Sequence, residues 1–167
     1  SKIEVFLIDG GLKSIIVKDD GKGMSEKDIE IAFKRHTTSK IYLKEDLFNI
    51  KTLGFRGEAL PSIASVSMLS ASSIDANMEY AHELKIHGGD FKGIKKTALD
   101  KGTLIKVENI FYNLPARKKF LKSESAELNK ITDIVKSYAL CYPGIEFLYH
   151  NNSKCIYKLP KSNLRNR

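Results

Sequence analysis

The chain has 167 residues, of which 42% are hydrophobic and 29% charged, a composition that suits one soluble globular domain with a real core. No apolar run approaches the roughly 18 residues that a membrane-spanning helix needs, which argues against a helical membrane protein and predicts no membrane partner. The 28 Lys and Arg residues outnumber the 20 Asp and Glu residues, and the net charge of +8 permits attraction to nucleic acid or nucleotide phosphates without selecting either.

The first 66 residues predict two strands followed by two helices. Ser25 is a favourable N-cap for the first helix, because Asp28 lies three residues later. Pro61 falls near the first turn of the second helix, where proline is tolerated. The expected elements, in chain order, are strands 2–8 and 12–19 around an Asp-Gly-Gly hairpin turn, helix 25–35, an ordered loop or lid over 36–52, and helix 57–66.

The rest of the chain predicts mostly strands and one long helix. The helix over 125–140 is amphipathic, with four apolar residues on one face: Leu128, Ile131, Val135 and Tyr138. The other expected elements are strands at 67–73, 79–89 and 102–111, a polar hairpin connection over 88–102, a short basic helix over 115–121, and a hairpin formed by 145–150 and 154–159.

This order of elements predicts an α+β fold, a two-layer α/β sandwich in which a mixed, mostly antiparallel sheet carries its helices on one face. Residues 1–160 are expected to form one domain. Residues 161–167 are expected to form a frayed tail or the start of a linker.

The sequence D-D-G-K-G-M follows the second strand and contains the first candidate binding residues. A carboxylate accepts hydrogen bonds only, so Asp19 suits the exocyclic amine of adenine. Gly21 and Gly23 would keep side chains away from a flat ring. The alternative is an ordinary turn after a strand, because D-x-G-x-G is also common turn chemistry.

The sequence L-G-F-R-G-E-A-L places Gly54 and Gly57 on either side of Arg56, just before a helix. Helix N-termini expose unpaired N–H groups and glycine permits close approach, so this stretch predicts an anion site. The alternative is a tight loop before a helix. P-loop, G-x-G-x-x-G and G-x-S-x-G patterns are absent from the sequence, which argues against P-loop and Rossmann proteins, kinases with a Gly-rich loop and serine hydrolases.

Taken in order with R-H-T-T-S-K, G-T and N-L-P-A-R-K-K-F-L, these two motifs resemble those of the DNA mismatch-repair MutL family, over almost the whole chain. That family belongs to the GHKL superfamily of ATPases, which have the Bergerat fold. The resemblance implies the N-terminal ATPase domain of such a protein, in which ATP binding drives dimerisation of a clamp that acts on DNA.

The resemblance also implies roles for individual residues. Asp19 would bind adenine with Gly21 and Gly23 beside it, and the hydroxyl of Thr103 would support this network; a plain strand threonine is the alternative. Thr38, Ser39 and Lys40 would belong to a lid over the nucleotide, although the first two could instead cap the next segment. The triphosphate loop and the start of the helix that follows it would comprise Gly54, Phe55, Arg56, Gly57, Glu58, Ala59 and Leu60. For Arg56 alone, the alternative is a surface ion pair with Glu58.

In that family an E-x-x-x-N motif on a helix ahead of the first strand supplies the water-activating glutamate and the Mg²⁺-binding asparagine, and no such motif precedes the first expected strand in these 167 residues. The Mg²⁺ ligand is therefore expected upstream of this chain. We expect ATPase activity from the full-length protein and little from these 167 residues alone, with ATP and Mg²⁺ as cofactors and no catalytic residue assigned.

Implied partners are DNA, bound without sequence preference, a mismatch sensor of the MutS type, and a second MutL-type chain in a homo- or heterodimer. Two rival functions remain open here: a nucleotide-independent DNA-binding or assembly module, and another GHKL ATPase of the gyrase type.

Only Cys141 and Cys155 are cysteines, without C-x-x-C spacing, which favours a reducing compartment: the cytoplasm in bacteria or the nucleus in eukaryotes.

Overall fold

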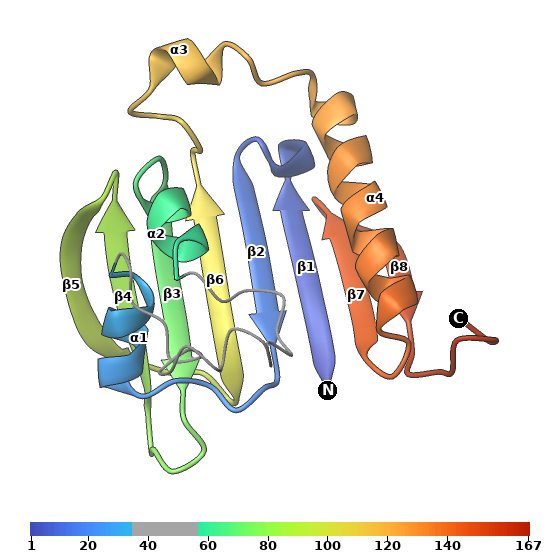
Figure 1. Ribbon diagram of the computed structural model, residues 1–167, viewed down its shortest axis with the longest axis horizontal. Coiled ribbons are helices and arrows are strands. Elements are labelled where there is room, and N and C mark those ends of the chain that lie inside the picture. Colours follow the sequence, from blue (N-terminus) through green and yellow to red (C-terminus); the bar gives the residue numbers. More distant parts are fainter. Residues whose placement is uncertain (35–56) are drawn as a thin grey trace, which may run out of the picture.

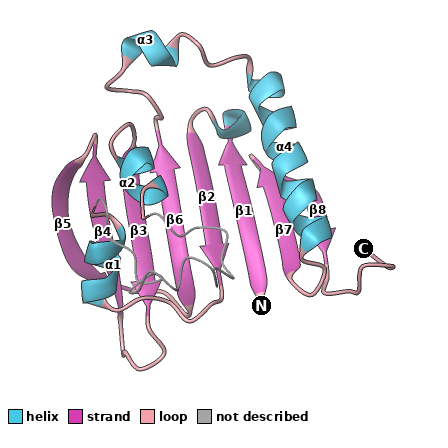
Figure 2. Ribbon diagram, in the orientation of Figure 1, coloured by secondary structure: helices cyan, strands magenta, loops and turns pink. Residues whose placement is uncertain are grey.

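The fold is one twisted sheet with helices on one face (Figures 1 and 2). A computed structural model describes residues 1–34 and 57–167. Its elements are β1 (Lys2–Ile8), the 3-10 helix η1 (Asp9–Gly11), β2 (Ser14–Asp19), α1 (Glu26–Ala32), α2 (Ala59–Ala64), β3 (Met68–Ile74), β4 (Ala81–His87), β5 (Asp90–Thr97), β6 (Gly102–Glu108), α3 (Pro115–Lys118), α4 (Glu124–Cys141), β7 (Glu146–Asn151) and β8 (Lys154–Leu159). No helix among these residues is long and apolar enough to cross a membrane.

The strands follow the order β5-β4-β3-β6-β2-β1-β7-β8. The pairing of β1 with β7 is parallel, and the other neighbouring pairs are antiparallel. The expected α+β fold class, with a mixed and mostly antiparallel sheet, is confirmed. Figure 1 shows α1, α2 and α4 on the same face of this sheet, while α3 lies beyond its end.

Local sequence explains where the main helices begin. Ser25 caps α1: its hydroxyl accepts a hydrogen bond from the Asp28 N–H, and the Asp28 carboxylate accepts one from the Ser25 N–H, which forms the expected capping box. The hydroxyl of Ser123 accepts from the Ala126 N–H in the same way at the start of α4. Both helices therefore have a defined first turn before tertiary packing is considered.

Two hydrophobic clusters fill the space between the layers. One lies under α1 and α2 and joins Ile29 and Ala64 to side chains of β3 and β4 such as Leu69 and Leu84. The other lies under α4 and joins Val135 to β1 and β7. The central strands β6 and β2 run between these two clusters, and the candidate site lies at one end of them.

The polar stretch 88–102 is not a simple hairpin connection as expected. Residues Asp90–Thr97 form β5, an edge strand that pairs antiparallel with β4 and is interrupted by an irregularity beside Lys85 and Ile86. Because of its lysines, this segment has the polar composition that is typical of a loop, so the sequence did not predict a strand here. Charged residues are favoured on edge strands, because they discourage pairing with other chains.

The core-facing side of α4 also differs from the expectation at one position. Val135 is buried, and Leu128 and Ile131 pack against the same cluster, as expected. Tyr138 instead leaves 45% of its surface exposed and stacks on Tyr142.

Residues after Leu159 form no regular element, but they do contact the domain. The Ser162 N–H donates to the Pro143 carbonyl, and the Arg167 guanidinium donates to the carbonyls of Pro143 and Ile145.

Candidate functional site

Polar side chains occupy the same end of three neighbouring strands. Asp19 is the last residue of β2, Thr103 lies at the start of β6, and Ser73 lies near the end of β3. The strand registers pair Thr103 with both Asp19 and Ser73, so the three side chains share one face of the sheet. Ile105, two residues after Thr103, packs on the core under α1 and α2. The shared face is therefore the one that carries the helices.

Asp19 is held by the turn that follows it. Its Oδ1 accepts a hydrogen bond of 2.8 Å from the Gly21 N–H. Among the described residues, the hydrogen bonds of this carboxylate involve Oδ1 only, which leaves Oδ2 as an acceptor toward a ligand. Val17, on the same face two residues earlier, is 40% exposed. The inner face beside Asp19 thus offers an open apolar surface next to an oriented acceptor.

Glycine is required at two positions that bring this loop close to the sheet. Gly23 has φ 71°, and a Cβ there would overlap the carbonyl oxygen of Ile74 at the end of β3. Gly102 has φ 80°, and its Cβ would overlap the Asp19 carbonyl oxygen. An L-residue is disfavoured at such φ values even where space is available. The close approach of β2, β6 and the D-x-G-x-G loop therefore depends on these glycines.

Thr103 belongs to a buried hydrogen-bond network that the sequence analysis only partly anticipated. Its hydroxyl lies 2.9 Å from the Ser73 hydroxyl. Ser73, which is fully buried, also contacts the Gly102 carbonyl at 3.0 Å and accepts from the Met24 N–H at 2.9 Å. Sequence motifs did not identify Ser73. The alternation of Leu69, Ala71 and Ser73 along the strand could have identified Ser73, because it places a hydroxyl on a face that is otherwise apolar.

The second group of predicted residues lies at the start of α2. Gly57 has φ 65°, and α2 runs over Ala59–Ala64 directly after it. The carbonyl of Glu58 accepts the first helical hydrogen bond, from the Ser62 N–H. Leu60 packs against the core cluster under α1 and α2, so its side chain has a structural role and only its backbone could contact a ligand.

Six predicted residues lie outside the described part of the chain: Thr38, Ser39, Lys40, Gly54, Phe55 and Arg56. Asp19, Gly21, Gly23 and Thr103 are brought together, whereas Gly57 to Leu60 form a separate group. The adenine part of the prediction is thus described in the structure, and the phosphate part is described only at its helical end.

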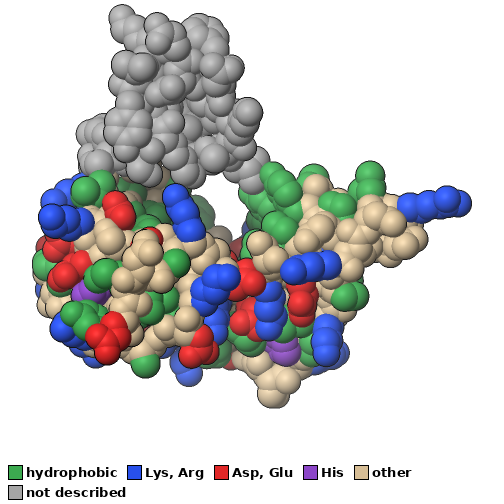
Figure 3. Space-filling view, turned by 90° about the horizontal axis from the view of Figure 1, so that it is seen from below, with side chains coloured by type: hydrophobic (Ala, Val, Ile, Leu, Met, Phe, Trp, Pro, Cys, Tyr) green, Lys and Arg blue, Asp and Glu red, His purple; other side chains and the backbone are tan. Residues whose placement is uncertain are grey.

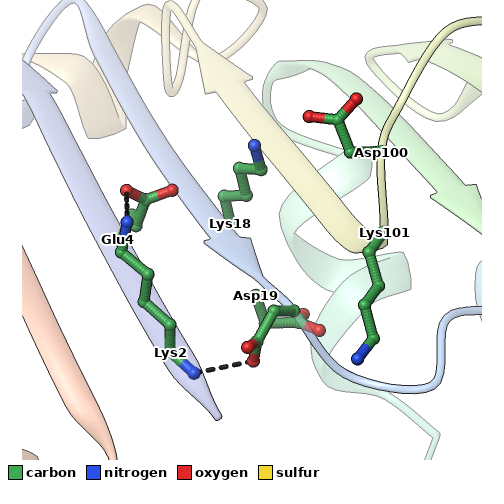
Figure 4. Close-up of a pocket in the computed structure, with 7 residues that line it drawn as sticks. Lys2, Glu4, Lys18, Asp19, Asp100 and Lys101 are labelled. Atoms are coloured by element: carbon green, nitrogen blue, oxygen red, sulfur yellow. Dashed lines mark hydrogen bonds and ion pairs between the residues drawn. The ribbon is translucent and has the colours of Figure 1, made fainter.

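A small pocket of about 180 Å³ lies at the same end of the sheet. Figure 4 shows its charged lining: Lys2, Glu4, Lys18, Asp19, Asp20, Asp100 and Lys101. Glu4 and Lys18 pair across β1 and β2 on the face opposite the core residue Val5. Seen from this end, Lys and Arg side chains are interspersed with Asp and Glu (Figure 3). This volume is below the roughly 300 Å³ that is usual for small-molecule sites, and the lining includes Asp19 but not Thr103.

The two neighbouring aspartates have different partners. The Lys2 N–H donates to Asp20 Oδ1 at 2.6 Å, and this hydrogen bond lowers the pKa of Asp20. The Lys2 ammonium lies 2.6 Å from Glu4 Oε1, which raises the pKa of Lys2. The Asp20 carboxylate is thus hydrogen-bonded to β1, while the Asp19 side chain lies on the face of the sheet that carries the helices.

Comparison with known proteins gives consistent results. No family model matches the chain. The DNA mismatch repair protein MutL of Bacillus mycoides is 46% identical over 166 residues, which are 99% of this chain and 26% of that protein. The MutL of Streptococcus equi subsp. equi is 45% identical over 154 residues, covering 92% of this chain and 23% of the relative. This chain therefore spans about a quarter of the length of the curated relatives it matches.

Solved structures agree with the fold. The Aquifex aeolicus MutL ATPase domain complexed with ADP superposes with a TM-score of 0.80 at 31% identity, covering 99% of this chain and 58% of that one. The N-terminal domain of a DNA repair protein gives a TM-score of 0.78 at 31% identity, with 98% and 50% coverage.

Proposed function

We propose that this chain, which belongs to the MutL family of DNA mismatch-repair proteins, binds ATP with Asp19 as the adenine-recognising residue. The observation that carries the proposal is the position of the Asp19 carboxylate at the open end of the inner face, paired in register with Thr103. The ADP named for the similar Aquifex domain supports a nucleotide at this fold.

The local chemistry suits adenine. The N6 amine of adenine is a donor, and Oδ2 of Asp19 is an acceptor. Gly21 and Gly23 present backbone without side chains in the loop that follows, so a flat ring can approach it. Val17 offers an exposed apolar side chain on the same face. These features together provide one polar contact and one apolar contact for the base.

For the triphosphate we propose the loop that ends at Gly57. The positive φ of Gly57 turns the chain into α2, and the N–H groups of Gly57 to Leu60 are the described candidates for contact with phosphate oxygens. Gly54, Phe55 and Arg56, with the lid residues Thr38, Ser39 and Lys40, complete the proposal from the sequence motifs.

The test is the substitution Asp19→Asn in the intact natural protein that carries this sequence. Asparagine keeps the size but replaces one acceptor oxygen by a donor. Losing a charge-assisted hydrogen bond should cost about 1.5–3 kcal/mol, or roughly 10- to 100-fold in ATP affinity measured by titration calorimetry. Asp20→Asn is the matched control, because Asp20 bonds to Lys2. Equal ATP affinity of the wild type and Asp19→Asn would rule out the assignment.

Mg²⁺ is proposed as the companion of the triphosphate. Within residues 1–34 and 57–167, no three His, Cys, Asp or Glu side chains are grouped so that they could hold a metal ion. We therefore assign no described residue as its ligand. The ligand is proposed to lie outside the described residues, and the chemistry that Mg²⁺ would supply is charge neutralisation of the phosphates.

The proposed partners are DNA, a mismatch sensor of the MutS type and a second MutL-type chain, with ATP binding favouring dimerisation. Three basic clusters are candidates for DNA phosphates: residues 92–101, 117–122 and 161–167. Figure 1 shows that the segments carrying them lie apart, with β5 at one edge of the sheet, α3 beyond its end, and the C-terminus beyond the other edge. The cluster at α3 is exposed at Arg117, Lys118, Lys119 and Lys122, and we propose it as the DNA contact.

A further inference from the structure

We propose that Ser73 is a positioning residue that makes the Thr103 hydroxyl a hydrogen-bond acceptor toward the bound base, and so strengthens the preference for adenine. The inference rests on the proposed nucleotide site and adds to it a residue that no motif identified. Ser73 does not touch the base in this proposal. It acts through the direction of the hydrogen bond that it shares with Thr103.

Ser73 lies where three segments of the site meet. It is fully buried near the end of β3 and faces Thr103 across the β3–β6 ladder. Its hydroxyl contacts Thr103 Oγ1 at 2.9 Å, the Gly102 carbonyl oxygen at 3.0 Å and the Met24 nitrogen at 2.9 Å. One side chain therefore connects β6 to the end of the D-x-G-x-G loop.

Counting protons decides the direction of these bonds. A serine hydroxyl has one hydrogen to donate and can accept two hydrogen bonds. The Gly102 carbonyl can only accept and the Met24 N–H can only donate, so Ser73 donates to Gly102 and accepts from Met24. The contact with Thr103 is then satisfied only if the Thr103 hydroxyl donates to Ser73. The opposite direction would use the Ser73 hydrogen for Thr103 and leave its contact with the Gly102 carbonyl without a proton, which is costly for buried groups.

The consequence is an edge of acceptors facing the base. With its hydrogen directed at Ser73, Thr103 presents only lone pairs on its other side. Thr103 pairs directly with Asp19, whose side chain is about 5 Å away at the Cβ atoms in such a pair. Two neighbouring acceptors suit the N6 amine of adenine, directly or through a water that donates to Thr103. They disfavour the O6 carbonyl that guanine and hypoxanthine carry at the same position, because an acceptor would face acceptors.

The experiment compares ATP with ITP, whose base carries O6 but lacks the bulky 2-amino group of guanine. Affinities for both are measured by titration calorimetry in the intact natural protein, for the wild type and Ser73→Ala. The alanine variant frees the Thr103 hydrogen to turn toward O6. The ratio of ATP to ITP affinity should then fall by roughly tenfold, the effect of about one hydrogen bond.

The controls separate this role from a structural one. Ser72→Ala removes a hydroxyl from the same strand on the opposite face, where Ser72 pairs with Leu104, and should leave the ratio unchanged. Ser73→Thr keeps the hydroxyl and should retain the wild-type ratio. If Ser73→Ala weakens the binding of ATP and of ITP equally, Ser73 only stabilises the end of the D-x-G-x-G loop through the Met24 N–H, and the proposal is overturned.

Thr103→Val provides a second test if Ser73→Ala does not fold. Valine keeps the shape of threonine and removes the acceptor, so the ratio of ATP to ITP affinity should fall in this variant too. An unchanged ratio would overturn the proposal, because it would mean that the Thr103 oxygen does not contribute to base discrimination. A wild-type protein that binds neither nucleotide would overturn the proposed function itself, an outcome distinct from binding with an unaltered ratio.

Discussion

Replacing Gly102 by alanine should destabilise the fold far more than one methyl group ordinarily does. Gly102 has φ 80°, a conformation that costs an L-residue about 1–2 kcal/mol. The added Cβ would overlap the Asp19 carbonyl oxygen and would also lie 2.8 Å from the Asp19 carbonyl carbon and 2.9 Å from Asp20 Cα. All three are backbone atoms, so no side-chain rotation relieves the overlap, and β6 must move away from β2.

Overpacking of this kind costs typically about 1–3 kcal/mol. Added to the conformational cost, it gives an expected loss of about 2–5 kcal/mol in the free energy of unfolding, measured for the 167-residue chain by urea titration and circular dichroism. Gly144→Ala is the matched control, because a Cβ added at Gly144 would have no described atom within 4 Å and the φ of Gly144 is not in the positive region.

The control should change the free energy of unfolding by less than about 1 kcal/mol, with either sign. A Gly102→Ala variant that loses no more stability than Gly144→Ala would refute the reasoning. The same displacement moves Asp19 relative to Thr103, so ATP affinity of the intact protein should fall in Gly102→Ala and remain unchanged in Gly144→Ala.

Two further predictions concern charge. The hydrogen bond from the Lys2 N–H lowers the pKa of Asp20 in the folded state, so its stabilisation is present above the ordinary pKa of 3.8 and is lost as pH falls through the lower folded value. Asp20→Asn should therefore reduce the free energy of unfolding more at pH 7 than at pH 3, and an equal reduction at both would contradict this cause. For DNA, replacing Lys118 and Lys122 by alanine should weaken binding to all duplexes alike and flatten the slope of log affinity against log salt by about 1–2. A slope that matches the wild type would place the DNA contact elsewhere.

Much of the secondary structure was predictable because its causes are local. The capping box of Ser25 and Asp28 and the turn between β7 and β8 depend on residues within a few positions of each other. The same holds for Asp19 with its following glycines, whose conformation the Gly21 N–H stabilises directly. Short-range hydrogen bonding and φ preferences depend on neighbouring residues and not on tertiary packing, so they can be inferred from the sequence.

Three features were not predictable in this way. The strand β5 pairs with β4 at the edge of the sheet, although its lysines give it the composition of a polar loop. Tyr138 has the right spacing for the core face of α4, yet it stacks on Tyr142 and stays half-exposed while Ala139 is buried. The parallel pairing of β7 with β1 joins segments at opposite ends of the chain, and no local pattern specifies it.

The sequence by itself determined the family and the two-layer fold class, and it supplied most residues of the proposed adenine site, because motif spacing and hydrophobic alternation are properties of the linear chain. Only the tertiary structure decided which side chains meet. Asp19, Ser73 and Thr103 are separated by at least 30 positions, and they become neighbours through the registers of β2, β6 and β3. A register shift of one residue would turn each side chain to the opposite face. The hydrogen-bond direction at Thr103 therefore depends on pairing between strands, which the linear sequence does not display.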